Sequence, residues 1–283
     1  MRNKVILITG CSTGIGFDAS ITLKKRGYHV IACCRKSKDV KRLIQLGIDS
    51  VIMDVSNPHS IDKAFQEILK KSSQRIDVLI NNAGYGQAGA LEDITYETMV
   101  EQFATNVFGL MELTRLVIPI MRAQKNGRII NISSLLGIIS MPFRGAYNAS
   151  KYAVEAISDT LRIELKPSGI DVITIEPGPV TSEFRNSAID NSLKKIDIDH
   201  SHFKSQYQTM LHSFRKQKDE STFTKKPGAV TKKIIHAIES HKPKAKYPVT
   251  FPAHLFAILK RFLSVKMLDR FITTISKHEV SSK

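Results

Sequence analysis

Tyr147 and Lys151 stand four residues apart in a segment, 146–166, whose apolar residues recur at helical spacing. That spacing places both side chains on one helix face, about one turn apart. The reference pKa of a phenol is about 10, and a nearby cation favours the phenolate, so Tyr147 could exchange a proton near neutral pH. Ser134 ends a strand-like segment, 128–133, and its hydroxyl could hold a substrate oxygen beside that phenol. The same spacing also occurs among ordinary surface residues, so other segments must support the chemistry.

A glycine turn follows the first apolar run of the chain. Residues 5–8 are Val-Ile-Leu-Ile, which is typical of a central parallel strand, and T-G-C-S-T-G-I-G follows at 9–16. Gly10, Gly14 and Gly16 allow a tight turn, and the helix that starts there presents unpaired N–H groups to a phosphate. The turn lacks the G-K-[ST] ending of a nucleoside-triphosphate loop, so we expect a dinucleotide, with an ordinary strand-to-helix turn as the alternative.

The residues after the next two strands indicate which dinucleotide binds. NAD-binding chains usually carry an acid about twenty residues past the glycines, whereas a basic residue accommodates a 2′-phosphate. Arg35 stands at that position, and Ser12 could add a hydroxyl donor; the alternative is a cation of no significance at a helix start. Asp54 closes the third strand, where it could reach an adenine edge.

Strand-like and helical segments alternate along residues 1–181, which predicts an α/β fold with a doubly wound parallel sheet of the Rossmann type. We expect one domain over 1–283. It comprises a cofactor-binding and catalytic core at 1–181, a substrate lid at 182–226, and a helical C-terminal extension at 227–283 that consists of a helix, a strand and capping helices. Gly84 to Gly89 also matches G-x-G-x-x-G, but no long helix follows, so we interpret it as a loop beside a ligand.

Asn106 lies among apolar neighbours in a long helical segment that Thr95 can cap and that ends near Gln124. A buried amide needs hydrogen-bonding partners. Two interpretations are open. Asn106 could form a structural hydrogen bond between helices, or it could have a functional role through a backbone distortion or an ordered water that leads toward Lys151.

The positive charge of the chain is concentrated in its last third. The formal net charge is +16, and residues 185–283 contain 20 Lys and Arg against 8 Asp and Glu. This region shows no zinc spacing, RNA-binding signature or aromatic stacking run, so we expect a solvated basic face, no nucleic acid and no metal ion.

The three cysteines form no C-x-x-C pair, and residues 5–8 are too short for a signal peptide, which together favour a cytoplasmic location.

Residues 251–275 combine apolar and basic side chains. Such a helix could lie weakly on an anionic membrane, or it could cap an apolar pocket or a dimer face, and we prefer the cap. The substrate lid and this segment predict an apolar small-molecule substrate and a homo-oligomer.

Together these residues resemble the short-chain dehydrogenase/reductase family. The resemblance covers about the first 180 residues and rests on the glycine turn at 9–16, N-N-A-G at 81–84, Asn106, Ser134, Y-x-x-x-K at 147–151, and P-G at 177–178. More narrowly, A-C-C-R-K at 32–36, K-Y-P-V at 246–249 and the basic extension resemble the branch of 17β-hydroxysteroid and retinol dehydrogenases, and bacterial NADP-dependent aldehyde reductases within it.

The resemblance implies a role for each matching residue. Tyr147 would be the general acid in carbonyl reduction, Lys151 would hold the nicotinamide ribose and lower the tyrosine pKa, Ser134 would orient the carbonyl oxygen, and Asn106 would keep a proton-relay water. The remaining cofactor contacts would be Gly10, Ser12, Thr13, Gly14, Ile15 and Gly16 at the diphosphate and adenosine ribose, Arg35 at the 2′-phosphate, Asp54 and Val55 at the adenine, Asn82, Ala83 and Gly84 at the ribose, and Pro177, Gly178, Val180 and Thr181 at the nicotinamide.

The resemblance therefore implies an NADP-dependent oxidoreductase that acts on an aldehyde, ketone or alcohol by direct hydride transfer. Two alternatives from other classes stay open. One is a catalytically silent NADP sensor, against which the intact Ser134, Tyr147 and Lys151 count. The other is a peripheral membrane or nucleic-acid binder that uses the basic third.

Overall fold

A parallel sheet of seven strands, in the order β3-β2-β1-β4-β5-β6-β7, forms the centre of the protein. The computed structural model describes residues 4–181, 195–216 and 223–280. The strands are β1 (Val5–Thr9), β2 (His29–Cys34), β3 (Asp49–Ile52), β4 (Val78–Asn81), β5 (Gly127–Ile132), β6 (Ile170–Glu176) and β7 (Lys246–Pro248). The predicted doubly wound sheet is confirmed.

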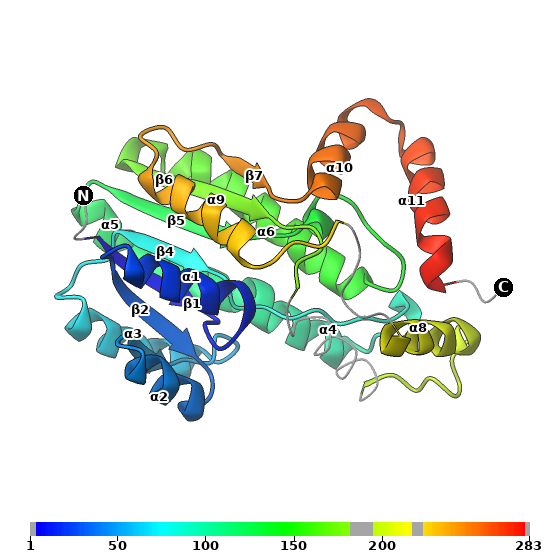
Figure 1. The fold of residues 1–283 in the computed structure, drawn as a ribbon, viewed down its shortest axis with the longest axis horizontal. Helices are drawn as coiled ribbons and strands as arrows, with labels where there is room; N and C mark the ends of the chain where they lie inside the picture. The colour runs from blue at the N-terminus through cyan, green and yellow to red at the C-terminus, as the bar shows by residue number, and fades with distance from the viewer. Residues whose placement is uncertain (1–3, 182–194, 217–222, 281–283) are drawn as a thin grey trace.

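Helices cover both faces of the sheet (Figure 1). The α-helices are α1 (Gly14–Lys25), α2 (Ser37–Gln45), α3 (Pro58–Lys71), α4 (Tyr96–Phe103), α5 (Gly109–Ala123), α6 (Gly145–Glu164), α8 (Lys204–Lys216), α9 (Gly228–Glu239), α10 (Phe251–Phe262) and α11 (Val265–Val280). Short 3-10 turns are η1 (Leu91–Asp93), η3 (Leu135–Gly137) and η4 (Lys166–Ser168), and η2 (Ala104–Phe108) is a π-helical segment.

The strands are apolar on both faces because each face carries a separate core. Alternate strand residues such as Ile6 and Ile8 pack with α1, α2 and α9. The intervening residues, such as Val5 and Leu7, pack with α3, α5 and α6. Burial on both sides explains why these strands read as continuous apolar runs rather than alternating ones.

The run from α4 to α5 is long and apolar enough to cross a membrane by length and composition. Its apolar side, however, is already used, because Leu113, Val117 and Met121 are fully buried against the sheet. We therefore interpret it as a core helix. Thr95 caps it as predicted, by accepting a hydrogen bond from the Thr98 amide at 3.2 Å.

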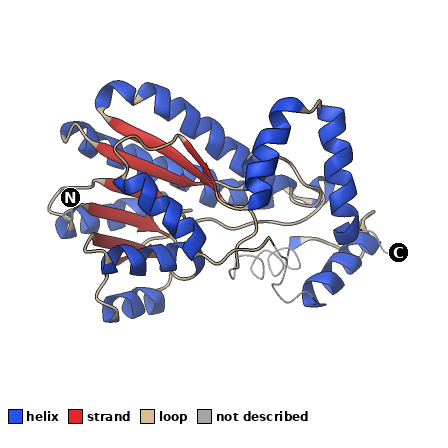
Figure 2. Cartoon of the chain, turned by 45° about the horizontal axis from the view of Figure 1, so that its top comes forward, coloured by secondary structure: helices blue, strands red, loops and turns tan. Residues whose placement is uncertain are grey.

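The C-terminal extension contains the expected helix, strand and capping helices, but the break between the capping helices was not located from the sequence. Residues 251–275 read as one helix, but the structure contains two, because Leu263 is extended (ψ 140°) and ends α10. Ser264 starts α11, since its carbonyl accepts from the Leu268 amide at 3.0 Å. The two helices form a hairpin that stands with α8 beyond the ends toward which the strands point, as Figures 1 and 2 show.

Candidate active site

The site begins where the strand order reverses, at the carboxyl ends of β1 and β4, which is where sheets of this kind bind ligands. The Asn82 side-chain amide donates to the carbonyls of Thr9 at 2.9 Å and Gly10 at 3.0 Å. The Thr9 hydroxyl accepts from the backbone amides of Asn82 and Ala83 at 3.1 and 3.0 Å. Residues 81–84 therefore hold the glycine turn in place.

The glycine turn has no room for larger residues. Gly10 has a φ of +71°, and a Cβ on it would lie 2.7 Å from the Ala83 Cα. A Cβ on Gly16 would lie 2.4 Å from the Gly10 carbonyl oxygen. Close backbone packing of this kind lets a phosphate approach the first turn of the following helix.

The start of α1 has the properties of a diphosphate site. Thr13 is the N-cap of α1, is exposed, and forms no side-chain cap hydrogen bond, so it leaves the first N–H groups of the helix uncapped. The residues present thus fit the diphosphate of a dinucleotide, since a helix N-terminus favours an anion. Ser12, Gly14 and Ile15 are partly exposed at the same turn.

Two arginines follow β2, one directly after the strand and one on α2 beside the glycine turn. Arg35 is exposed immediately after β2, as the sequence predicts. Arg42, on α2, donates to the Ser12 carbonyl, and its guanidinium lies 5.0 Å from the centre of the Phe17 ring. The sequence analysis missed Arg42, because only the packing of α2 against the turn brings this helix residue to it.

Asp54 and Val55 lie beyond β3. The Asp54 carboxylate accepts from the Ser56 amide at 3.0 Å and from its hydroxyl at 2.7 Å, which fixes its orientation. Val55 is buried, and its carbonyl oxygen would lie 1.9 Å from a Cβ on Gly109. Their assignment to the adenine stays a prediction.

Ser134 and Tyr147 meet in a buried position after β5. Ser134 caps η3 by accepting from the Leu136 amide at 3.1 Å, which holds its side chain beside α6. Its hydroxyl forms a hydrogen bond with the Tyr147 phenol. Burial raises the pKa of Tyr147 to about 12, and the Ser134 hydrogen bond lowers it in part. The phenol is therefore a proton donor at neutral pH.

Lys151 lies beside Tyr147 on α6. Its ammonium lies 5.8 Å from the centre of the Tyr147 ring and donates to the Ile132 carbonyl at 2.7 Å. Its expected effect on the tyrosine pKa and its contact with the nicotinamide ribose stay predictions. Burial lowers the pKa of Lys151 itself to about 8, and the charge of Glu155 raises it.

Behind Lys151 lie acids that the sequence analysis missed. Glu155 follows Lys151 by one turn of α6 and is buried, and Lys246 of β7 donates to it at 2.7 Å. Glu176, at the end of β6, is also buried, and desolvation together with Glu155 raises its pKa to about 7. The i, i+4 spacing of Lys151 and Glu155 was visible in the sequence, but a helical ion pair is usually a surface feature.

Asn106 is satisfied by protein groups. Its Oδ1 accepts from the Tyr85 amide at 3.0 Å, and its Nδ2 donates to the Tyr85 carbonyl and to the Ser150 hydroxyl, both at 3.0 Å. It lies in the π-helical segment η2, so both the expected backbone distortion and the expected bond between helices occur. A Cβ on Gly84 would lie 3.1 Å from this Oδ1 and 3.8 Å from the Lys151 Nζ. The proton-relay water stays a prediction.

The loop after β6 is fixed on both sides. The Leu135 amide donates to the Pro177 carbonyl at 2.8 Å, and the Thr181 amide donates to the Lys225 carbonyl at 2.9 Å. Val180 pairs with Lys225 in an isolated bridge. Gly178 packs so closely on Thr250 that a Cβ would lie 2.1 Å from its hydroxyl oxygen. Pro177, the first of the predicted nicotinamide residues, thus contacts Leu135, which directly follows Ser134, while their assignment to the nicotinamide stays a prediction.

Apolar residues surround the substrate side. The described part of the predicted lid packs Ile196, Tyr207 and Met210 on Ala90 and Phe143. Residues 182–194 and 217–222 of that lid lie outside the described residues. The C-terminal hairpin packs Phe256 and Ile272 on Leu135 and Ile139, immediately after Ser134. In the described part, the segments that follow Ser134 and precede Tyr147 thus pack in apolar clusters.

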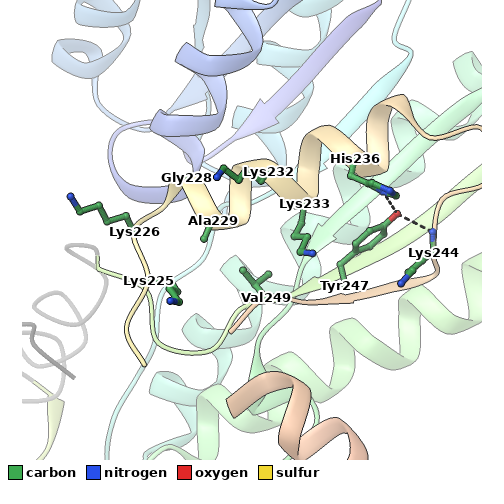
Figure 3. A pocket seen from close by; sticks show the side chains of 10 residues that line it. All are labelled: Lys225, Lys226, Gly228, Ala229, Lys232, Lys233, His236, Lys244, Tyr247 and Val249. Carbon is green, nitrogen blue, oxygen red and sulfur yellow. Dashed lines mark hydrogen bonds between the residues drawn. The ribbon is translucent and has the colours of Figure 1, made fainter. Parts of the chain in front are cut away.

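A basic cavity of about 710 Å³ lies apart from this site, between α9 and β7 (Figure 3). It is lined by Lys225, Lys226, Lys232, Lys233, Lys244 and His236, among others, and none of the described residues that line it is acidic. Part of the positive charge expected in the last third of the chain thus lines this one cavity. Lys225 connects this cavity to the loop at 177–181.

Comparison with known proteins identifies related chains. Residues 4–192 match the family model described as short chain dehydrogenase. Uncharacterized oxidoreductase YbbO of Escherichia coli is 39% identical, over 96% of this chain and 95% of its own. 3-Ketodihydrosphingosine reductase of Bacteroides thetaiotaomicron is 35% identical, over 83% and 84%. NADPH-dependent 3-dehydrocapnine reductase of Ornithobacterium rhinotracheale is 32% identical, over 93% and 94%.

Proposed function

The chain belongs to the short-chain dehydrogenase/reductase family, and from that premise we propose that it is an NADPH-dependent reductase of a ketone or aldehyde on a long apolar chain. Its activity is that of an oxidoreductase on CH–OH and carbonyl groups with a nicotinamide cofactor. The observation that carries the proposal is the buried Ser134–Tyr147 pair, with Lys151 beside it, at the carboxyl ends of the strands.

The chain's own residues supply the acid step. When bound, the nicotinamide supplies the hydride that the carbonyl carbon accepts. Ser134 and Tyr147 hold the carbonyl oxygen, and Tyr147 gives it a proton, because its pKa of about 12 keeps the phenol protonated at working pH. Lys151 is largely charged below pH 8 and favours the negative charge that develops on that oxygen.

Two observations support NADPH over NADH. Arg35 stands after β2 in place of an acid, and Arg42 adds a second cation at the Ser12 turn. A guanidinium binds a phosphate through charge-assisted, paired hydrogen bonds. A related chain is named for its NADPH dependence.

The apolar surroundings of the site support the substrate class. Leu135 and Ile139 follow Ser134 in the chain and Phe143 precedes Tyr147, and each packs in an apolar cluster, which suits an alkyl chain rather than a charged metabolite. Two relatives are named for 3-keto or 3-dehydro compounds, one of which is a keto derivative of a long-chain base. We place the enzyme in the cytoplasm, since all three cysteines are free and buried.

The test measures NADPH oxidation with long-chain aldehydes and ketones. Tyr147→Phe should lower kcat by about 10²-fold or more, because a positioned acid contributes that much. Tyr28→Phe is the matched control, since the Tyr28 hydroxyl bonds Glu239, before the start of β2 and away from the carboxyl ends of the strands. A Tyr147→Phe variant within a few-fold of the wild type would overturn the assignment, and activity restricted to small charged substrates would overturn the substrate class.

A further inference from the structure

The turn between α10 and α11 exposes apolar side chains that the fold leaves uncovered. Phe262 is 81% exposed and Val265 is 76% exposed, and Ile258 and Met267 are also exposed. Isolated exposed apolar residues are ordinary, but here they are grouped on one turn at the end of a helical hairpin. Figure 1 places this turn at the outer edge of the molecule, away from the sheet.

The packing of the hairpin fixes which side faces outward. Lys260 donates to the Ile138 carbonyl at 2.5 Å and lies 4.6 Å from the centre of the Tyr152 ring, so it faces the body of the protein. Phe256 and Ala253 pack on Leu135 and Ile139 from the same helix. Phe262 follows Lys260 by two residues, which is about 200° around a helix, and so it is directed to the opposite side.

Cations surround the apolar turn. Arg261, Lys266 and Arg270 are exposed and form no ion pair within the described residues. Asp269 is the one acid among residues 251–276. Apolar side chains surrounded by lysine and arginine match the interface of an anionic lipid bilayer. The apolar side chains enter the headgroup region there, and the cations contact the lipid phosphates.

A second copy of the chain fits this turn less well. Around a two-fold axis the same patch meets itself, so Arg261 and Lys266 would face their own copies. The turn is also convex and small, whereas a stable interface takes about 800 Å² from each partner. Charge and shape therefore both favour a lipid surface.

We propose that the α10–α11 turn docks the enzyme on anionic membranes and that the lipid carbonyl substrate reaches Ser134 from there. The docking step stands on the hairpin alone, whereas the delivery step rests on the proposed function. The hairpin connects the turn to the site, because Phe256 and Ile272 pack on Leu135, which directly follows Ser134, and Thr250, the N-cap of α10, lies beside Gly178.

The experiment measures sedimentation of the full chain with vesicles of phosphatidylcholine alone, or of equal parts phosphatidylglycerol and phosphatidylcholine. Wild-type protein should bind the anionic vesicles at low salt and be released as the salt rises. Phe262→Ser with Val265→Ser should weaken binding about tenfold or more, because both apolar side chains leave the bilayer. Ile163→Ser, another 76% exposed apolar residue, is the control and should change nothing.

Charge reversal separates a specific turn from a generally basic protein. Arg261→Glu with Lys266→Glu should weaken binding to anionic vesicles by about fivefold or more for each cation. Lys232→Glu with Lys233→Glu makes the same change in net charge at the α9 cavity and should change binding far less. Equal losses in both variants, or no binding by the wild type, would overturn the docking proposal. A fall in molecular mass of the Phe262→Ser and Val265→Ser variant would assign the turn to a dimer and would also overturn it.

Activity distinguishes docking from catalysis. A long-chain ketone embedded in anionic vesicles should be reduced about tenfold or more slowly by the turn variants, while a short soluble ketone is reduced at the wild-type rate. Equal rates on the embedded ketone would overturn substrate delivery. Wild-type protein that binds vesicles and reduces neither ketone would reject the proposed function while leaving docking supported.

Discussion

At the residue scale, burial governs the chemistry of Tyr147 and Lys151. The sequence placed the pair on one helix face, and that expectation agrees with the structure. It also suggested that the cation lowers the phenol pKa, which stays a prediction, whereas burial raises that pKa to about 12. The spacing of residues in the sequence can therefore predict which side chains lie close together. Their pKa values depend on burial, which that spacing does not reveal.

Arg35 carries the first residue-scale prediction. Arg35→Asp should weaken NADPH binding at least about tenfold and leave NADH binding similar or tighter, because a well-placed charge-assisted hydrogen bond contributes about 1.5–3 kcal/mol and the new carboxylate repels the 2′-phosphate. Calorimetry of both nucleotides with both proteins measures it. Lys36→Asp, the same charge change at the next exposed residue, is the control. Wild-type protein that binds NADH as tightly as NADPH would show that Arg35 faces solvent.

Arg42 and Glu155 show why some of the site residues could not be predicted. Motif positions such as Gly10 or Ser134 follow a strand directly, so the parallel sheet brings their backbones to one edge. Arg42 and Glu155 lie inside helices, and they reach the site only because α2 and α6 pack as they do. No local pattern distinguishes them from surface charges.

At the scale of elements, the link between α6 and β7 tunes the site. Lys246 of β7 bridges Glu155 at 2.7 Å and Asp159 at 3.2 Å on α6, so the carboxylate nearest Lys151 is held from the edge strand. Removing that carboxylate should make the Lys151 cation less favourable and lower its pKa below about 8.

Glu155→Gln should therefore move the pH dependence of reduction. As pH rises through about 8, Lys151 loses its proton and its charge, so kcat/KM should fall on the alkaline side, and in the variant that fall should begin at lower pH. The measurement is kcat/KM on a soluble ketone between about pH 6 and pH 10. Asp159→Asn also removes a partner of Lys246 but should leave the profile in place. If both variants lose stability and neither profile shifts, Glu155 is structural only.

The elements themselves could be predicted wherever periodicity and caps agreed. β1 spans Val5–Thr9 and α6 spans Gly145–Glu164, close to the strand at 5–8 and the helix at 146–166 that the sequence indicated. The break at Leu263 was missed, because an apolar residue before a serine carries no strong stop signal. The π-helical segment was expected only as a distortion at Asn106, since its form depends on the bonds to Tyr85 and Ser150.

At the scale of the whole molecule, the described residues expose apolar side chains in several places, and two of these surfaces bear on binding and assembly. One is the α10–α11 turn. The other is a stripe along α4 to α5, where Tyr96 is 79% exposed, Phe108 is 57% exposed and Val100 is 40% exposed. This stripe is long rather than convex and carries no cluster of cations, so it suits an interface between copies of the chain, where the aromatic residues would be buried.

We therefore predict a homo-oligomer through the α4–α5 stripe. Phe108→Glu should shift the protein toward monomer, because each two-fold contact would bury two unpaired carboxylates. Light scattering after size-exclusion chromatography measures the mass across a range of protein concentrations. Phe262→Ser is the matched control, since it removes an equally large exposed ring from the other surface and should leave the mass unchanged. A wild-type chain that is monomeric at every concentration would reject the prediction, and loss of the oligomer in the control alone would move the interface to the C-terminal hairpin.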